Sequence, residues 1–161
     1  MPSLIFDAQS EDDTRRLGQA LAEVLSPGTV VALSGTLGSG KTRLVQAVAR
    51  SLGVPQESVL SPTFVLLHEY QGTRPIYHFD VYRVRDVDEF EQLGPEEYFD
   101  SEGICFIEWA ERVEACLPAD RIEIHIEITS ETDRRFTIRG HGSAAEKTVD
   151  ALAQRLAADP S

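Results

Sequence analysis

A glycine-rich segment, Gly35-Thr36-Leu37-Gly38-Ser39-Gly40-Lys41-Thr42, has the pattern GxxxxGKT and constrains the fold more than any other part of the chain. An apolar run over residues 30–33 precedes it, and residues 43–48 have their apolar side chains at helical spacing. The order strand, glycine loop, helix is typical of a phosphate-binding loop. Its glycines let backbone N–H groups turn toward a polyphosphate, and the helix adds the positive end of its dipole. We therefore predict an α/β domain with a nucleotide site at this loop.

Two side chains of the loop have specific expected roles. Lys41 would reach the β- and γ-phosphates, and the Thr42 hydroxyl would bind Mg²⁺. A glycine-rich turn can match the pattern by chance, but the flanking strand and helix favour nucleotide binding. Lysine is also rare in this chain, because Lys41 and Lys147 are the only two among 15 basic residues. The single lysine in the first half falls where a phosphate-binding loop requires it.

Length and composition indicate one compact domain over residues 1–161, located in the cytoplasm. Hydrophobic residues make up 42% of the chain and charged residues 26%, which is ordinary for a globular protein. The first residues lack the basic region and apolar core of a signal peptide, and no apolar run is long enough to span a membrane. We expect Cys105 and Cys116 to be buried thiols rather than a disulfide or a zinc site.

The formal net charge of −12 limits the expected partners. A surface this acidic repels a phosphate backbone and lacks the broad basic face that nucleic-acid binding uses. Direct, tight binding of RNA or DNA is therefore disfavoured, and a nucleotide would be held by a local positive site. The acidic run between Glu89 and Asp100 is most simply a solvated face, and less simply a docking surface for a basic partner.

The pattern of apolar and polar residues along the rest of the chain predicts a P-loop NTPase-like domain of three layers. Its sheet would be mixed and mostly parallel, with some antiparallel strands and with helices on both faces. Helices are expected over 11–25, from 43 to 52, in two short pieces over 86–99, over 110–117 and after a capping Ser143. Strands are expected over 29–33, 65–70, 76–83, 103–108, 121–128 and 134–139.

Individual strands have distinct expected places. The strand over 103–108 is apolar throughout and ends in a carboxylate, which predicts a central parallel strand buried on both faces. The strand over 121–128 alternates strictly, which places it nearer an edge with one wet side. The strands over 65–70 and 76–83 are joined by a short turn, so we expect them to be antiparallel neighbours.

Two acids are candidates for the metal-binding residue that a phosphate-binding loop takes from a second strand. Glu108 ends the continuous apolar strand, the usual place of that acid, and is the preferred Mg²⁺ ligand. Asp80 ends a more amphipathic strand and would organise the attacking water or a switch segment, although either acid could simply cap a loop. The expected catalytic residues are therefore Lys41, Asp80 and Glu108.

Several other residues could sense the γ-phosphate or contact a partner. Ser61 and Thr63 lie between the loop helix and the next strand, where many P-loop proteins keep a γ-phosphate-sensing segment, although an ordinary proline turn explains them equally well. His78 could be a metal ligand, a base, or a histidine satisfied by hydrogen bonds at a sheet end. Trp109, the only tryptophan, could belong to the core or to a contact surface near the nucleotide.

Four motifs, GxLGxGKT, SPTF, HFDxYR and IEW, occur in this order over roughly residues 10–140, and the chain resembles the TsaE family, also called YjeE. These are small bacterial P-loop ATPases required to make the threonylcarbamoyl modification of adenosine 37 in tRNA. The resemblance implies ATP and Mg²⁺ as cofactors. It also implies TsaD-like and TsaB-like partner proteins, tRNA contact only through their complex, and no membrane contact. Family members do not transfer threonylcarbamoyl themselves, and their weak ATP hydrolysis is expected to permit repeated turnover.

The resemblance also assigns residues. It implies that Thr42 and Glu108 contact Mg²⁺, and that Asp80 and Trp109 matter for hydrolysis or partner contact. The residues expected to bind ATP are Thr14, Gly35, Thr36, Leu37, Gly38, Ser39, Gly40, Lys41, Thr42 and Arg134. The residues expected at a switch or partner contact are Ser61, Thr63, His78, Tyr82, Arg83 and Trp109.

Three other functions fit the loop. A GTPase usually selects guanine with an NKxD motif, but the chain contains no asparagine, so adenine is preferred. A small-molecule kinase would use the same loop and acid, but no arginine-rich lid is visible over residues 84–100. A nucleotide-gated binding module with negligible hydrolysis of its own would be recognised by weak turnover that a partner accelerates.

Overall fold

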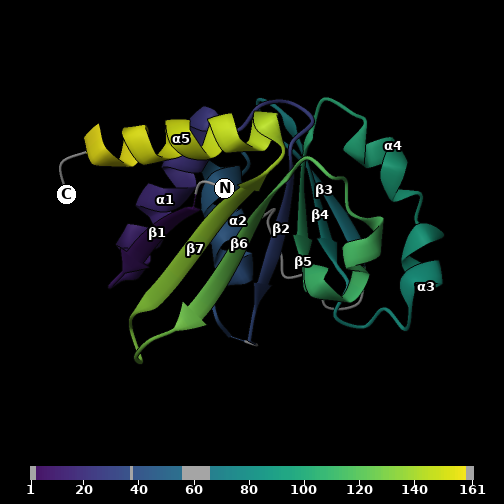
Figure 1. The fold of residues 1–161 in the computed structure, drawn as a ribbon, viewed down its shortest axis with the longest axis horizontal. Coiled ribbons are helices and arrows are strands. Elements are labelled where there is room, and N and C mark those ends of the chain that lie inside the picture. Colours follow the sequence, from purple (N-terminus) through teal and green to yellow (C-terminus); the bar gives the residue numbers. More distant parts are fainter. Residues whose placement is uncertain (1–2, 37, 56–65, 159–161) are drawn as a thin grey trace.

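The computed structural model describes residues 3–36, 38–55 and 66–158 (Figure 1). In these ranges seven strands form one mixed sheet with the order β1-β7-β6-β2-β5-β4-β3. Parallel pairing joins β6, β2, β5 and β4, and antiparallel pairing adds β7 and β1 on one side and β3 on the other. The strands are β1 (Ser3–Ala8), β2 (Val30–Gly35), β3 (Leu67–Gln71), β4 (Pro75–Asp80), β5 (Ile104–Glu108), β6 (Arg121–Ile128) and β7 (Arg134–His141).

Helices cover both faces of this sheet and make it the middle of three layers. On one face, α1 (Glu11–Val24), α2 (Lys41–Ser51) and α5 (Ser143–Ala158) pack their leucines and valines against the sheet in one apolar core. On the other face, a second core joins α3 (Val87–Glu91), α4 (Pro95–Phe99) and the 3₁₀ helix η2 (Ala110–Cys116) to the strands. The expected α/β fold class is confirmed.

The register of the central strands sets the position of the functional residues. Leu33 of β2 lies opposite Glu108 of β5, and Asp80 of β4 lies opposite the same Glu108. The three parallel strands therefore end at one edge of the sheet, where β2 leads into the glycine loop. The carboxyl edge of parallel strands is the usual place for a site in this kind of fold. As predicted, β5 is buried along its whole length between two parallel neighbours.

The observed strands differ from the expected ones in three places. β1 was not predicted; it pairs with β7, whose residues are more than a hundred positions away in the chain. β6 does have one wet face, but it is the third strand from its edge because β7 and β1 lie outside it. β4 ends at Asp80 rather than at Arg83, because the Asp80 carboxylate accepts a hydrogen bond from the Tyr82 N–H at 2.9 Å and forms a local turn.

The observed helix caps and the burial of the two cysteines match the predictions only in part. Ser10 caps α1, since its hydroxyl accepts a hydrogen bond from the Asp13 N–H at 3.3 Å. Ser143 is instead the first residue of α5, and Asp120 accepts hydrogen bonds from two N–H groups of the first turn at 3.4 and 3.1 Å. Cys105 is buried, and burial raises the pKa of its thiol to about 12. Cys116 is only half-buried, so the expectation of two buried thiols holds for the first alone.

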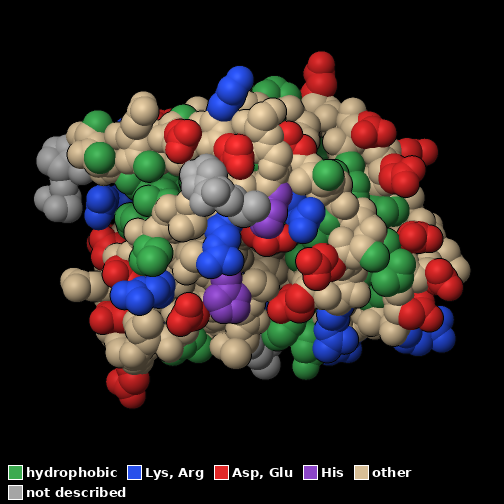
Figure 2. All heavy atoms as spheres, in the orientation of Figure 1, with side chains coloured by type: hydrophobic (Ala, Val, Ile, Leu, Met, Phe, Trp, Pro, Cys, Tyr) green, Lys and Arg blue, Asp and Glu red, His purple; other side chains and the backbone are tan. Residues whose placement is uncertain are grey.

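The surface of α3 and α4 is acidic, as the sequence indicated. Glu91, Glu96, Glu97 and Asp100 are exposed, and acidic side chains are prominent over these two helices in Figure 2. No helix in the described ranges is both long enough and apolar enough to cross a bilayer.

Candidate nucleotide and metal site

The glycines of the loop have two different physical roles. Gly35, Gly38 and Gly40 all have positive φ angles, of 144°, 80° and 114°. A Cβ atom at Gly35 would lie 2.6 Å from the Ile126 carbonyl oxygen, so Gly35 allows the loop to pack against β6. A Cβ atom at Gly38 or Gly40 would meet nothing within 4 Å. Their open sides, together with the first N–H groups of α2, leave room for an anion.

We expect Gly35→Ala to destabilise the protein by about 3 kcal/mol, because the added methyl group combines steric overlap with an unfavourable φ angle. The matched variant Gly38→Ala carries only the backbone strain and is expected to lose about 1 kcal/mol. Urea denaturation of both variants measures the difference. Equal losses would show that contact with Ile126 does not limit position 35.

Lys41, the first residue of α2, is almost fully buried among acceptors at the loop. Its ammonium donates hydrogen bonds to the carbonyl oxygens of Gly35 at 2.6 Å and Thr36 at 3.0 Å. The same nitrogen lies 3.9 Å from the centre of the Trp109 ring. Burial lowers the pKa of the Lys41 ammonium, although the carboxylates of Glu108, Glu111 and Asp80 oppose this shift.

Thr42 and Glu108, the two residues expected to hold Mg²⁺, are in direct contact. The Thr42 hydroxyl lies 3.0 Å from one carboxylate oxygen of Glu108 and 2.8 Å from the other. Glu108 is only 4% exposed, and its second oxygen also contacts His78. The pair joins the first turn of α2 to the end of β5 at the loop.

These two residues fit a magnesium ion. Hydroxyl and carboxylate oxygens are the hard ligands that Mg²⁺ prefers, and Mg²⁺ in nucleotide sites usually takes its other ligands from phosphates and water. Within the described ranges, no group of three or more His, Cys, Asp or Glu side chains is arranged to hold a metal ion. A metal ion at this pair would therefore take its other ligands from phosphate and water rather than from a cage made by the protein alone.

Asp80 lies beside this pair and remains partly accessible. Burial raises the pKa of the Asp80 carboxyl; the hydrogen bond from the Tyr82 N–H opposes the shift, and the nearby charge of Glu108 adds to it. A carboxyl group whose pKa is higher in the folded than in the unfolded state is destabilising in its charged form. Its position at a charged edge, with a perturbed pKa, is typical of a functional acid.

We expect Asp80→Asn to raise the melting temperature at pH 7 by about 1–3 °C. The folded protein binds a proton at Asp80 more tightly than the unfolded chain, so the destabilisation grows as the pH rises from 3.8 through the folded pKa. The gain should therefore shrink toward pH 4. Asp7→Asn is the matched control with the opposite sign, because its pairing with Arg135 lowers the pKa of Asp7. A lower melting temperature for Asp80→Asn at pH 7 would contradict the expectation.

A cavity of about 490 Å³ lies next to the loop, and five of the predicted nucleotide contacts line it: Thr14, Gly38, Ser39, Gly40 and Arg134. Thr14 of α1 and Arg134 of β7 both line it, and Arg134 donates a hydrogen bond to the carbonyl oxygen of Ser39 at 3.1 Å. Ser39 itself has a fully buried side chain, and its N–H donates to the Thr36 carbonyl at 3.0 Å. The lining residues that were not predicted as nucleotide contacts are Gln9, Ser10, Glu11, Arg43, Glu131, Thr132 and Phe136.

Trp109 and Tyr82 form an aromatic wall beside the lysine. Their rings lie 4.8 Å apart, and the Arg112 guanidinium lies 5.2 Å from the centre of the Tyr82 ring. Trp109 has a φ angle of 63° and is the only residue other than glycine with a positive φ in the described part of the chain. Such backbone strain is often found at functional sites. Arg83, which follows Tyr82 in the chain, is exposed.

Some predicted residues lie outside the described ranges, and some residues of the site were not predicted. Leu37, Ser61 and Thr63 belong to the first group. Tyr70, which contacts His78, was missed because a single tyrosine in a strand carries no signal of its own. Arg43 and Glu11 pair across the cavity and were also missed, although both flank predicted motifs.

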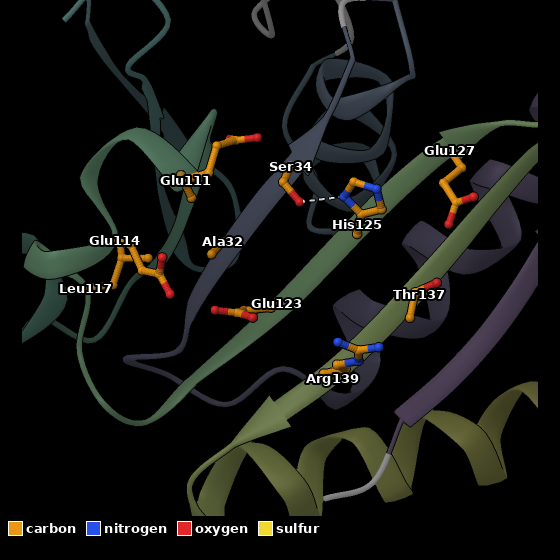
Figure 3. Close-up of a pocket in the computed structure, with 11 residues that line it drawn as sticks. Ala32, Ser34, Glu111, Glu114, Leu117, Glu123, His125, Glu127, Thr137 and Arg139 are labelled. Carbon is orange, nitrogen blue, oxygen red and sulfur yellow. Dashed lines mark hydrogen bonds between the residues drawn. The ribbon is translucent and has the colours of Figure 1, made fainter. Parts of the chain in front are cut away.

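A second cavity, of about 280 Å³, lies on the other side of the sheet between η2 and the outer faces of β2, β6 and β7 (Figure 3). Its lining includes Glu111, Glu114, Glu123 and Glu127, with Arg139 as its one lysine or arginine. The Ser34 hydroxyl and the His125 ring are hydrogen-bonded at 2.8 Å there. A triphosphate would be repelled by these carboxylates, so the glycine loop is the better nucleotide site.

The central parallel strands, the glycine loop at their carboxyl edge and the Thr42–Glu108 contact define an α/β protein of the P-loop class. The comparisons with known proteins agree with this class. The sequence profile of the family "Threonylcarbamoyl adenosine biosynthesis protein TsaE" matches residues 8–136. The chain belongs to the TsaE family.

Individual relatives cover most of the chain. It is 36% identical over 155 residues to the tRNA threonylcarbamoyladenosine biosynthesis protein TsaE of Bacillus subtilis, covering 96% of both chains. It is 39% identical over 131 residues to the protein of the same name from Treponema pallidum, covering 81% of this chain and 96% of the relative. The crystal structure of Bacillus subtilis YdiB superimposes with a TM-score of 0.81 at 31% identity and 95% coverage of each chain.

Proposed function

We propose that this protein binds ATP with Mg²⁺ at the glycine loop and hydrolyses it weakly, in support of threonylcarbamoylation of adenosine 37 in tRNA. The observation that carries the proposal is the contact between Thr42 and Glu108 beside the ammonium of Lys41. It brings a hydroxyl, a carboxylate and a cation together at the open side of a phosphate-binding loop. These are the groups that phosphoryl transfer requires.

Each residue has a distinct part in this proposal. Bound Mg²⁺ would be held by Thr42 and Glu108 and would neutralise charge on the phosphates. Lys41 and the loop N–H groups stabilise the negative charge of the transferring γ-phosphoryl group. Asp80 orients the water that attacks in line. Thr14 and Arg134 contact the nucleotide in the cavity of about 490 Å³.

The role in tRNA modification is that of an accessory protein. The curated relatives are named for threonylcarbamoyladenosine biosynthesis, which supports placing this chain in the same pathway. Its net charge of −12 disfavours direct binding of tRNA, so tRNA is reached through a complex of TsaD-like and TsaB-like proteins. In this proposal the protein works in the cytoplasm and makes no contact with a membrane. It does not itself transfer the threonylcarbamoyl group.

Two measurements test the proposal. Calorimetric titration with ATP and GTP, each with and without Mg²⁺, should show tighter binding of ATP when Mg²⁺ is present. Threonylcarbamoyladenosine formation by TsaD-like and TsaB-like proteins should then continue over several turnovers only when this chain and ATP are added. Binding without any hydrolysis would favour the nucleotide-gated module, and transfer of phosphate to a small-molecule acceptor would favour a kinase. Absence of ATP binding would overturn the proposal.

A further inference from the structure

We infer that Tyr70 and His78 are positioning residues that hold the Glu108 carboxylate ready for the metal ion, an inference that rests on the proposed Mg²⁺ site. The Tyr70 hydroxyl lies 3.2 Å from Nδ1 of His78. Nε2 of the same ring contacts Oε2 of Glu108, which Thr42 contacts in turn. A continuous hydrogen-bonded chain therefore runs from β3 through β4 and β5 to the first turn of α2.

These hydrogen-bonded side chains are buried, so water does not replace their contacts with one another. His78 is 0% exposed, and Tyr70 and Glu108 are each 4% exposed. A buried carboxylate is costly unless its oxygens accept hydrogen bonds from fixed donors. Strand geometry provides these donors, because Tyr70, His78 and Glu108 all point to the face that α2 covers, on three neighbouring strands.

The chemistry of the three groups determines which atom donates and which accepts in each hydrogen bond. An ionised carboxylate can only accept hydrogen bonds, so Nε2 of His78 is the donor in its contact with Glu108. In the neutral ring Nδ1 is then an acceptor, and the Tyr70 hydroxyl donates to it. Tyr70 thus fixes the tautomer of His78, and His78 fixes Glu108.

The contacts also distinguish the two oxygens of Glu108. Oε2 is engaged by both His78 and Thr42, whereas Thr42 is the hydrogen-bond partner found for Oε1 among the described residues. His78 therefore anchors one oxygen and leaves the other directed at Thr42, where a shared metal ion would bind. Hydrogen-bonded partners of this kind usually contribute about 10- to 100-fold to metal affinity.

The test compares the affinity for ATP with Mg²⁺ and with EDTA, and the ratio of the two affinities measures the contribution of the metal. His78→Leu should lower this ratio about 10- to 100-fold while leaving the affinity in EDTA unchanged. His78→Gln keeps a donor near Glu108 and should restore part of the ratio. Tyr70→Phe should lower it several-fold. Tyr77→Phe, which changes the opposite face of β4, is the matched control and should have no effect.

A nitrogen NMR spectrum of the nucleotide-free protein gives a second readout. His78 should show the Nε2–H tautomer in the unaltered protein and a mixture of tautomers in Tyr70→Phe. The inference is overturned if a folded His78→Leu keeps the full ratio, or if the variants weaken ATP binding equally in Mg²⁺ and EDTA. If the unaltered protein binds ATP no better with Mg²⁺, the proposed metal site fails and this inference fails with it.

Discussion

Replacing Lys41 with methionine is expected to lower the rate of ATP hydrolysis by about 100- to 1000-fold, the usual cost of removing one donor that stabilises transition-state charge. Methionine keeps an unbranched side chain of similar length beside Trp109 but loses the ammonium. The fold should not suffer, because burial lowers the pKa of Lys41 and its charged form is therefore costly in the folded state. Steady-state phosphate release, with a thermal melt on the same sample, measures both effects.

Lys147→Met is the matched control for this variant. Lys147 is the only other lysine, and it is exposed on α5, away from the loop. The Lys147→Met variant should hydrolyse ATP at the same rate as the unaltered protein. Unchanged hydrolysis by Lys41→Met would remove the loop lysine from the mechanism.

Glu108→Gln is expected to reduce the Mg²⁺-dependent part of ATP affinity by about 100-fold, since a neutral amide is a poor ligand for a hard divalent cation. Hydrolysis should fall with it, whereas ATP binding in EDTA should be nearly unchanged. Calorimetric titration with ATP in Mg²⁺ and in EDTA separates the metal-dependent part of the affinity from the metal-independent part.

Glu111→Gln controls for a general change of charge near Lys41. Glu111 contributes to the electrostatic field at that ammonium, but it belongs to η2 and lines the cavity on the other side of the sheet. Its variant should keep the dependence on Mg²⁺. A loss as large as that of Glu108→Gln would indicate that net charge, rather than a ligand at position 108, determines metal binding.

The sequence was most informative where a residue and its structural context are close in the chain. Lys41 and Thr42 follow from a motif of eight residues, and Glu108 follows from its place at the end of an unbroken apolar strand. Their convergence also follows, because parallel strands share a carboxyl edge. Local patterns therefore predicted the centre of the site and the class of the fold.

Features that depend on distant pairing were not predictable in this way. β1 is a short strand whose identity depends on pairing with β7, and the Asp120 cap of α5 comes from an earlier loop. Tyr70 acquires its role only when β3 and β4 pair in the observed register. The strict alternation of β6 correctly indicated one wet face, but alternation carries no information on how many strands lie outside it.

The consecutive placement of Glu108 and Trp109 has a mechanical consequence. One residue holds the threonine of the loop and the next covers its lysine, and η2 begins immediately afterwards at Ala110. A protein that pushes or pulls on η2 from outside would displace both groups together through one short piece of backbone. In the proposed mechanism, a contact made at the surface would therefore accelerate or arrest hydrolysis with no foreign side chain entering the pocket.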